Sequence, residues 1–227
     1  MSKHDQIDQT EEKFHEIEEG LNSAEQFMEK NSKNLTMGFG ALFILAVAII
    51  GYFKYYKAPR EQQARVEVFV AQNNFDRDSF DLALNGDGSG NSGFLDIMED
   101  YSGTSTANMA HYYAGISYLH MGKYEEAIKY LSDFSTEDQM LKPISIGAQG
   151  DAYAGLDKAD KAIEMYVKAA NSVENNMTTP IYLFKAAKLS ELKGDKTNAL
   201  KYLEVIENDY PKSNEARVVK KYIERLK

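Results

Sequence analysis

Between Asn85 and Asp96 the sequence reads NGDGSGNSGFLD, where glycines alternate with side chains that carry oxygen. Calcium loops follow the pattern D-x-[DN]-x-[DN]-G-x5-E, because carboxylate and amide oxygens coordinate the ion and glycine permits the sharp turn. Laid on this stretch, the pattern assigns the ligands of the ion to Asn85, Asp87, Ser89 and Asp96. The chemistry that these residues could perform is weak calcium binding.

Three departures from the pattern favour a simpler interpretation of this stretch. Asn85 replaces the first aspartate, Ser92 occupies the usual apolar position, and Asp96 is shorter than the bidentate glutamate. Only two formal charges would face the ion, so its affinity would be low at best. We therefore interpret the stretch as a surface insertion, and keep a weak calcium-responsive binding module as an alternative hypothesis.

The other residue types that commonly perform catalysis or bind metals form no recognisable site. The absence of cysteine excludes disulfides, zinc–thiolate sites and cysteine nucleophiles. Histidine occurs at His4, His15, His111 and His120, and the last two lie on different faces of one predicted helix, so they form no metal pair. No P-loop, G-x-S-x-G or H-E-x-x-H motif occurs. We predict that the chain is not an enzyme and has no cofactor.

The composition favours a folded helical protein that does not bind nucleic acid. Hydrophobic residues make up 43% of the chain and charged residues 27%, which is ordinary for a folded protein, and there are only four prolines. The net charge is -9, whereas binding of phosphates needs a basic face.

One segment has the length and composition of a membrane span. Residues 35–53, LTMGFGALFILAVAIIGYF, form a run of 19 residues without a charge. A helix of that length spans about 28 Å, close to the thickness of the hydrocarbon core of a bilayer. Aromatic and basic residues gather at its C-terminal end in YFKYYKAPR, as in an interface anchor. The sequence predicts a single-pass membrane protein.

The charges that flank this segment predict on which side of the membrane the C-terminal part lies. Lys30 and Lys33 precede the segment, whereas Lys54, Lys57, Arg60 and Arg65 follow it. The positive-inside rule therefore places the C-terminal part in the cytoplasm, although the rule is weak for long translocated domains.

The arm before the span, residues 1–34, holds nine acidic and four basic side chains. Apolar and small residues recur at alternating spacings of three and four, at Ile7, Thr10, Phe14, Ile17, Leu21, Ala24 and Met28. This stripe spans three heptads and is interrupted by Gly20, where Ser23 and Gln26 could cap a second short helix. A partner protein or self-association through residues 7–28 would suit the stripe, and a weakly helical solvated tail is the alternative.

A repeat organises the chain after Pro59. A small residue of one predicted helix and an alanine of the next lie 12 positions apart in three copies, which are offset by 35 and 37 residues. The signature residues are Gly115, Tyr118, Gly122 and Ala127, then Gly150, Tyr153 and Ala162, then Ala187, Gly194, Ala199 and the closing Pro211. Antiparallel helices approach closely only where small residues face each other, so this spacing predicts helical hairpins.

These residues resemble the tetratricopeptide repeat. The resemblance implies that each copy is a helix-turn-helix and that stacked copies form a right-handed superhelix with a concave groove for a protein or peptide partner. Ser190 replaces the aromatic residue in the third copy, and Asp157 stands where the first copy has Gly122. The residues that we expect to line the groove are His111, Tyr112, Tyr118 and Tyr153.

A degenerate earlier copy explains the glycine-rich stretch. Ala71 and Ala83 are again 12 positions apart, and IMEDY at 97–101 echoes IENDY at 206–210. The distance from Ala83 to the next equivalent alanine exceeds the later offsets by seven to nine residues. We therefore predict that residues 85–93 are an insertion within or after the second helix of this copy.

The predicted fold class is all-α, with five parts. They are an acidic amphipathic arm (1–34), a transmembrane helix (35–53), a juxtamembrane helix with the degenerate repeat (54–106), three tetratricopeptide repeats (107–211) and a capping helix (212–227). Six basic and two acidic side chains in the last part could contact lipid or an acidic partner. We favour compensation of the helix dipole and solubility as their role.

The order of acidic arm, span and helical repeats resembles the YfgM-type membrane-anchored tetratricopeptide proteins. The likeness is most local around AEQFMEKNSKNLTMGFG and GYFKYYKAPREQQA. It implies an ancillary partner of the Sec translocon in the inner membrane that links it to periplasmic chaperones, with the N-terminus cytoplasmic and the repeats periplasmic. A second hypothesis is a scaffold for envelope assembly, because ENDYPKSNEA also resembles repeats of outer-membrane assembly and division-associated proteins.

Overall fold

The computed structural model describes the backbone of residues 3–227 and the side chains of residues 17–18, 20–23 and 25–227. The described chain divides into two units, one that ends at Ala58 and one that runs from Pro59 to Lys227. Every regular element in the described range is helical, so the prediction of an all-α fold is confirmed.

The first unit is a long helix, α1 (Lys3–Tyr52), followed by a short π-helical segment, η1 (Phe53–Lys57). The apolar window of this helix is long enough to cross a membrane, and none of it is buried. In η1 the ammonium group of Lys57 lies 5.4 Å from the ring centroid of Phe53. Basic and aromatic side chains thus meet directly after the uncharged segment.

The arm is helical without a break at Gly20, which corrects the expectation of a second short helix there. A glycine costs only about 1 kcal/mol in a helix interior, and the Glu, Lys, Leu and Met residues around it favour helix. Of the stripe, Ile17, Leu21 and Met28 are exposed. Ile7, Thr10, Phe14 and Ala24, together with His4 and His15, have side chains outside the described residues.

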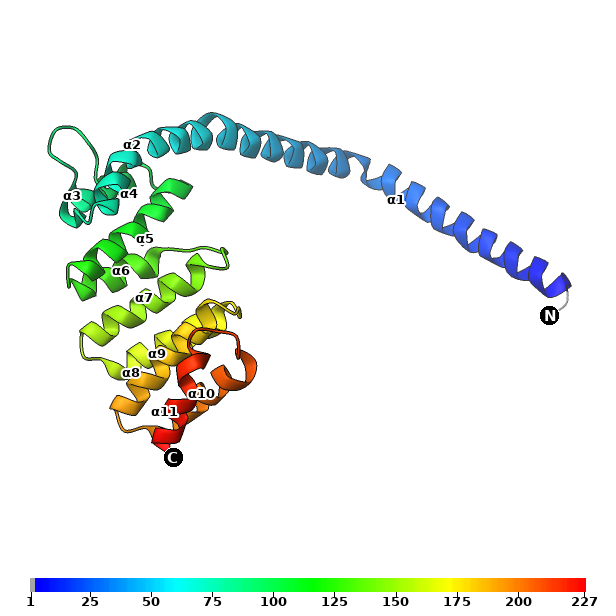
Figure 1. Ribbon diagram of the computed structural model, residues 1–227. Helices are drawn as coiled ribbons and strands as arrows, with labels where there is room; N and C mark the ends of the chain where they lie inside the picture. The colour runs from blue at the N-terminus through cyan, green and yellow to red at the C-terminus, as the bar shows by residue number, and fades with distance from the viewer. Residues whose placement is uncertain (1–2) are drawn as a thin grey trace. The chain divides into compact units, whose positions relative to one another are not determined.

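The second unit is a stack of helical hairpins, drawn from cyan to red in Figure 1. Its helices are α2 (Ala58–Asp76), α3 (Phe80–Asn85), α4 (Phe94–Asp100), α5 (Ser105–His120), α6 (Tyr124–Asp133), α7 (Leu141–Gly155), α8 (Ala159–Ser172), α9 (Thr178–Leu192), α10 (Lys196–Asp209) and α11 (Ala216–Leu226). The hairpin helices pack in antiparallel pairs, α5 with α6, α7 with α8 and α9 with α10.

Four turns of this unit share one geometry. A residue with positive φ closes the first helix of each hairpin, at Asp78, Gly122, Asp157 and Gly194. The N–H of this residue donates to the carbonyl three residues earlier, as from Gly122 to Leu119 at 3.1 Å. The next N–H donates to the carbonyl five residues earlier, as from Lys123 to Tyr118 at 2.9 Å. This pair of bonds is a Schellman motif, which satisfies the last carbonyls of a helix. The four turns lie 44, 35 and 37 residues apart, the same offsets as the repeat.

Small residues let the two helices of a hairpin touch. A Cβ atom on Gly115 would lie 2.5 Å from Cγ of Leu131 on the facing helix, and one on Gly150 would lie 2.6 Å from Cε1 of Tyr166. The alanines at the matching positions of the second helices, Ala127, Ala162 and Ala199, are fully buried. Larger side chains thus fill the space that these small residues leave.

The glycine-rich insertion divides the second helix of the first hairpin. Residues 86–93 separate α3 from α4, and Ala83, Leu84, Phe94 and Ile97 on the two sides of the loop are all buried in one apolar cluster with α2 and α5. The loop therefore projects from a helix whose two halves still pack as one layer. At the other end of the stack, α11 covers the last hairpin with Val219, Ile223 and Leu226.

Candidate protein-interaction surface

The first helices of successive hairpins form a continuous row. Helix α7 packs against both α5 and α9. Within the described residues the second helices α6, α8 and α10 make no comparable contacts with one another. The first helices therefore lie on the inner side of the curved stack, where a solenoid offers its largest pre-formed surface.

A charged and aromatic cluster joins α7 and α9 of this row with the second helix α8. The Asp151 carboxylate on α7 accepts a hydrogen bond of 2.7 Å from the Tyr166 hydroxyl on α8. Lys185 on α9 donates to both carboxylate oxygens of Asp151, at 2.7 and 2.8 Å. The same ammonium group lies 5.5 Å from the ring centroid of Tyr166 and 5.8 Å from that of Tyr182. Because both charged side chains are still partly exposed, a partner can also reach them.

The tyrosines of this cluster stay protonated. Burial, followed by the hydrogen bond to Asp151, raises the pKa of Tyr166, and burial, followed by the charge of Asp151, raises the pKa of Tyr182. Tyr166 therefore acts as a hydrogen-bond donor throughout the physiological range. Tyr182 lies against Gly147, where a Cβ atom would overlap its ring. Because Gly147 has no side chain, the ring of Tyr182 on α9 can pack directly on α7.

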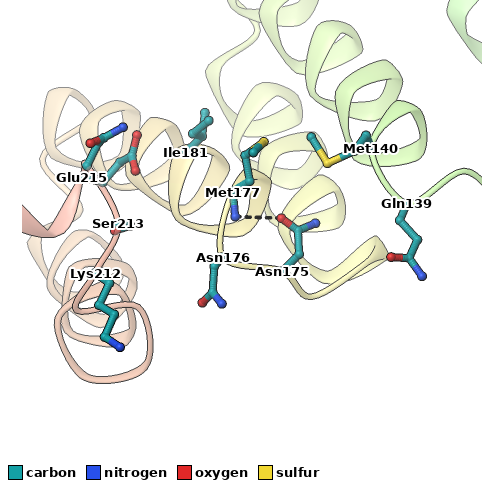
Figure 2. Close-up of a pocket in the computed structure, with 10 residues that line it drawn as sticks. Gln139, Met140, Asn175, Asn176, Met177, Ile181, Lys212, Ser213 and Glu215 are labelled. Carbon is teal, nitrogen blue, oxygen red and sulfur yellow. Dashed lines mark hydrogen bonds between the residues drawn. The ribbon is translucent and has the colours of Figure 1, made fainter.

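A cavity of about 450 Å³ opens at one edge of the row, where the loops between hairpins meet the first helices (Figure 2). Its lining residues are Gln139, Met140, Asn175, Asn176, Met177, Ile181, Lys212, Ser213, Asn214 and Glu215. Met140 and Met177 point toward each other from the starts of α7 and α9 in Figure 2.

Two equivalent polar caps hold the loops beside this cavity. Asp138 Oδ1 accepts hydrogen bonds from the backbone N–H groups of Met140 and Leu141, both at 2.8 Å. Asn175 Oδ1 accepts from Met177 at 2.9 Å and from Thr178 at 2.7 Å. Such side-chain acceptors satisfy the first N–H groups of a helix. The two loops therefore present Met140 and Met177 in the same manner.

Two of the hairpins match a known protein family. Residues 109–137 and 182–213 match the tetratricopeptide repeat family. These segments cover most of α5 with all of α6, and most of α9 with all of α10. The hairpin of α7 and α8 between them has the same turn geometry. The second unit is therefore an α-solenoid of tetratricopeptide-type hairpins. The search among curated proteins found no match for the chain.

The residues that the sequence assigned to the groove lie mainly inside their own hairpins. Tyr118 stacks on Tyr130 of the neighbouring helix with ring centroids 5.2 Å apart. The His111 ring also packs at a tilt against Tyr130, and burial lowers the pKa of His111. The ammonium group of Lys161 lies over Tyr153, 5.5 Å from its ring centroid. A role of these three residues in binding stays a prediction.

Tyr112, the fourth predicted groove residue, packs between α5 and the residues that follow α6. Its ring packs against Phe134 at a centroid distance of 5.3 Å. Burial raises the pKa of Tyr112, and its hydroxyl is close enough to Tyr182 to contribute to the raised pKa of that residue. Tyr112 on α5 thus lies near enough to Tyr182 on α9 to influence it electrostatically.

The side chains proposed for calcium mostly bind the protein itself. Asp87 accepts from the Asn91 side chain at 2.6 Å and from the backbone N–H of Ser89 at 2.9 Å, and these bonds lower its pKa. Asp96 accepts from the Gly93 N–H at 3.0 Å at the start of α4. Among the described residues no group of three or more His, Cys, Asp or Glu could hold a metal. This arrangement favours a hydrogen-bonded loop over an ion site.

Sequence reasoning missed Asp151, Lys185 and the two methionines. Asp151 and Lys185 are 34 positions apart, and nothing local to either residue signals a contact. A weak signal existed for the methionines, because Gln139-Met140 and Asn176-Met177 repeat at an offset of 37, which equals one of the repeat offsets.

Proposed function

We propose that the protein is a membrane-anchored scaffold that binds a protein or peptide partner through its solenoid. The observation that carries the proposal is that a helix with an uncovered apolar segment and a stack of tetratricopeptide-type hairpins occur on one chain. The anchor restricts the scaffold to a membrane surface, and the inner row of first helices supplies the binding face. Partners would reach the exposed atoms of the Asp151–Lys185 cluster and the adjacent loops.

The more specific proposal is an ancillary factor of the Sec translocon in the inner membrane, in contact with periplasmic chaperones. It rests on the resemblance of the segments around the span to YfgM-type proteins. In this proposal the acidic arm lies in the cytoplasm and the solenoid in the periplasm. The basic residues after the span oppose this orientation, because the positive-inside rule places them in the cytoplasm. That rule has little force for a long translocated domain.

Orientation can be tested directly because the chain contains no cysteine. A Ser89→Cys variant places a thiol on the exposed loop of the solenoid unit, and a Ser23→Cys variant places one on the arm. A membrane-impermeant maleimide added to intact spheroplasts should label Ser89→Cys at once and Ser23→Cys only after permeabilisation. The reverse pattern would overturn the proposed orientation and support the charge count.

Partner identity decides between the two scaffold hypotheses. The tagged full-length chain should be recovered from membranes in mild detergent, and the proteins that accompany it identified by mass spectrometry. Enrichment of translocon subunits with periplasmic chaperones is the expected result. Enrichment of envelope-assembly proteins without the translocon would support the second candidate, which rests on the ENDYPKSNEA segment. Recovery of the tagged chain without any partner would contradict the scaffold.

Moderate salt in the same experiment tests the mechanism of binding. Apolar and hydrogen-bond contacts on a pre-formed surface survive salt that screens exposed charges. We expect the partners to stay bound at about 0.5 M salt, well above the physiological ionic strength. Complete release at that concentration would mean that the solenoid holds its target through charge alone.

A further inference from the structure

Three apolar side chains line the cavity at the loop edge of the solenoid. Met177 is 62% exposed, Ile181 37% and Met140 36%, and all three line the same space of about 450 Å³. Ligand sites of proteins typically enclose about 300–1,000 Å³. Methionine is unbranched and polarizable, so paired methionines can adapt to apolar side chains of different shapes.

The rim of the cavity carries amide groups with unused hydrogen-bonding capacity. Within the described structure the side chains of Gln139, Asn176 and Asn214 make no hydrogen bond to protein. A side-chain amide offers both donors and an acceptor, which is what a peptide group requires. The positions 139, 176 and 213 recur at offsets of 37, so a polar side chain stands at the same place in three successive loops.

The cavity does not select a charged ligand. Its ten lining residues include one cation, Lys212, and one anion, Glu215, on a chain whose net charge is -9. A phosphate or carboxylate ligand would need a cluster of cations, and a basic peptide would need a cluster of carboxylates. Neither cluster lines this cavity.

The cavity is also held in place before any ligand arrives. Asp138 and Asn175 fix the loops through the backbone N–H groups described above. Pro143 and Pro180, in the first turns of α7 and α9, are fully buried. Proline in the first turn of a helix leaves no donor unsatisfied and restricts the backbone. A ligand therefore meets a preorganised surface, which lowers the entropic cost of binding.

From these observations we propose that this cavity, here named the methionine pocket (Met140, Met177 and Ile181 with its amide rim), binds an extended uncharged apolar peptide segment. An apolar side chain of the segment inserts between Met140 and Met177, and its peptide groups pair with the rim amides. This is recognition of an extended chain by side-chain pockets and polar groups that pair with its backbone. The inference names the class of segment that the proposed scaffold binds, and it rests on that proposed function.

The test uses the full-length chain in lipid nanodiscs and a fluorescein-labelled ten-residue peptide of alternating leucine and serine with both ends capped. We expect Met177→Glu to weaken binding tenfold or more, because the pocket would then bury a charge against leucine. Met177→Leu keeps an apolar side chain of similar volume, so its affinity should stay within about threefold of the unmodified chain. A peptide with serine in place of every leucine should not bind.

The matched control is Leu192→Glu. Leu192 is 81% exposed and lies at the other end of α9, so this variant adds the same charge to an apolar surface position away from the pocket. Its affinity should equal that of the unmodified chain, and empty nanodiscs give the binding of the peptide to lipid. Equal weakening by Met177→Glu and Leu192→Glu, or no weakening by either, would overturn the proposal.

A direct readout does not depend on the variants. With the nine methionines labelled at their methyl groups, addition of the leucine peptide should shift the NMR signals of Met140 and Met177 and leave the others in place. Shifts confined to other methionines would place the peptide elsewhere and refute the pocket. A dimer of the unmodified chain that Met177→Glu dissociates would show that a second copy occupies the site, which also refutes it.

The failure of this inference can be separated from the failure of the scaffold function. If the peptide leaves Met140 and Met177 unaffected while membrane partners still accompany the tagged chain, only the pocket is wrong. If no partner accompanies the tagged chain either, the scaffold itself is wrong.

Discussion

The carboxylate of Asp151 on α7 lies 2.7 and 2.8 Å from the ammonium group of Lys185 on α9, so one ion pair connects two consecutive hairpins. The carboxylate also accepts from Tyr166 on α8, the partner helix of α7. Most contacts of a solenoid join neighbouring helices, so a polar cluster that reaches the next hairpin couples the repeats. We therefore expect the cluster to make the unfolding of the two hairpins more cooperative.

Replacement of Asp151 by alanine should destabilise the solenoid by about 1–2 kcal/mol. The partly exposed ion pair alone is worth about 0–1 kcal/mol, and the variant also removes the acceptor of the hydroxyl of Tyr166, a buried residue. Urea unfolding followed by circular dichroism measures the change. Glu137→Ala, which breaks the more exposed pair with Lys142, should cost almost nothing. Equal losses in the two variants would show that Asp151 contributes no more than a surface charge.

The turns provide a paired prediction about backbone strain. Gly122 has φ of +73° and open space around its Cα, so Gly122→Ala should cost about 1 kcal/mol from conformation alone. Asp157 occupies the equivalent turn with φ of +56°, so Asp157→Gly should stabilise by up to about 1 kcal/mol. Thermal melts of both variants test this. The same sign of change in both would contradict the equivalence of the turns.

Close approach within a hairpin gives a third prediction. A Cβ atom on Gly115 would lie 3.0 Å from the backbone nitrogen of Leu131 as well as near its side chain. The backbone cannot move aside as a flexible side chain can, so Gly115→Ala should destabilise by about 1–3 kcal/mol. Gly20→Ala is the control, since nothing lies within 4 Å of Gly20 on α1. The urea midpoint of the solenoid should fall in the first variant and stay constant in the second.

Two buried serines should respond differently to alanine. Ser190 is 1% exposed and its hydroxyl has no hydrogen-bond partner, whereas the Ser117 hydroxyl donates to the Tyr113 carbonyl at 2.8 Å. Removal of an unsatisfied buried hydroxyl is neutral or stabilising, while loss of a made bond costs about 1 kcal/mol. We expect Ser190→Ala to melt at the same or a higher temperature than the unmodified chain and Ser117→Ala to melt lower. The opposite order would mean that Ser190 has a partner in solution.

The cap at Asp138 predicts a dependence of stability on acid. Hydrogen bonds from the backbone N–H groups of Leu141 and Met140 lower its pKa below the ordinary value of 3.8. A carboxyl with a lowered folded-state pKa stabilises the fold above its unfolded pKa, and this contribution is lost as the pH falls through the folded value. Asp138→Asn keeps a side-chain oxygen that can accept the same hydrogen bonds, as the Asn175 oxygen does in the next loop. The variant removes the carboxyl group that titrates. The unfolding free energy of the variant should therefore fall less steeply below about pH 4, where such carboxyls titrate. An unchanged acid slope would contradict this role.

The hairpins and the long apolar helix were predictable because their causes are local. Gly122 and Gly194 mark turns that need positive φ, and the uncharged residues 35–53 need no tertiary information to be recognised. The sequence placed the insertion either within or after the second helix of the first hairpin, because the number of inserted residues does not show whether the helix continues beyond them. The structure shows that α3 and α4 continue one packed layer around it.

The candidate interaction surface was less predictable because its contacts cross hairpins. The pairing of Asp151 with Lys185 depends on the angle between α7 and α9, which no residue pattern encodes. The break at Gly20 was predicted wrongly, because a residue preference of about 1 kcal/mol was given more weight than the helix formers around it. Tyr118 is part of the repeat signature and was expected in the groove, but its ring stacks on Tyr130 within the hairpin.

The loop between α3 and α4 has a practical consequence for engineering. Its two ends meet, since a Cβ atom on Gly93 would overlap the carbonyl oxygen of Leu84 and the nitrogen of Gly86. The residues at its tip, among them Gly88 and Ser89, are exposed. A loop with adjacent ends can be lengthened at small entropic cost, and exposed tips accept inserted domains. A fluorescent protein grafted at this tip would report on the solenoid while both chain termini remain unmodified.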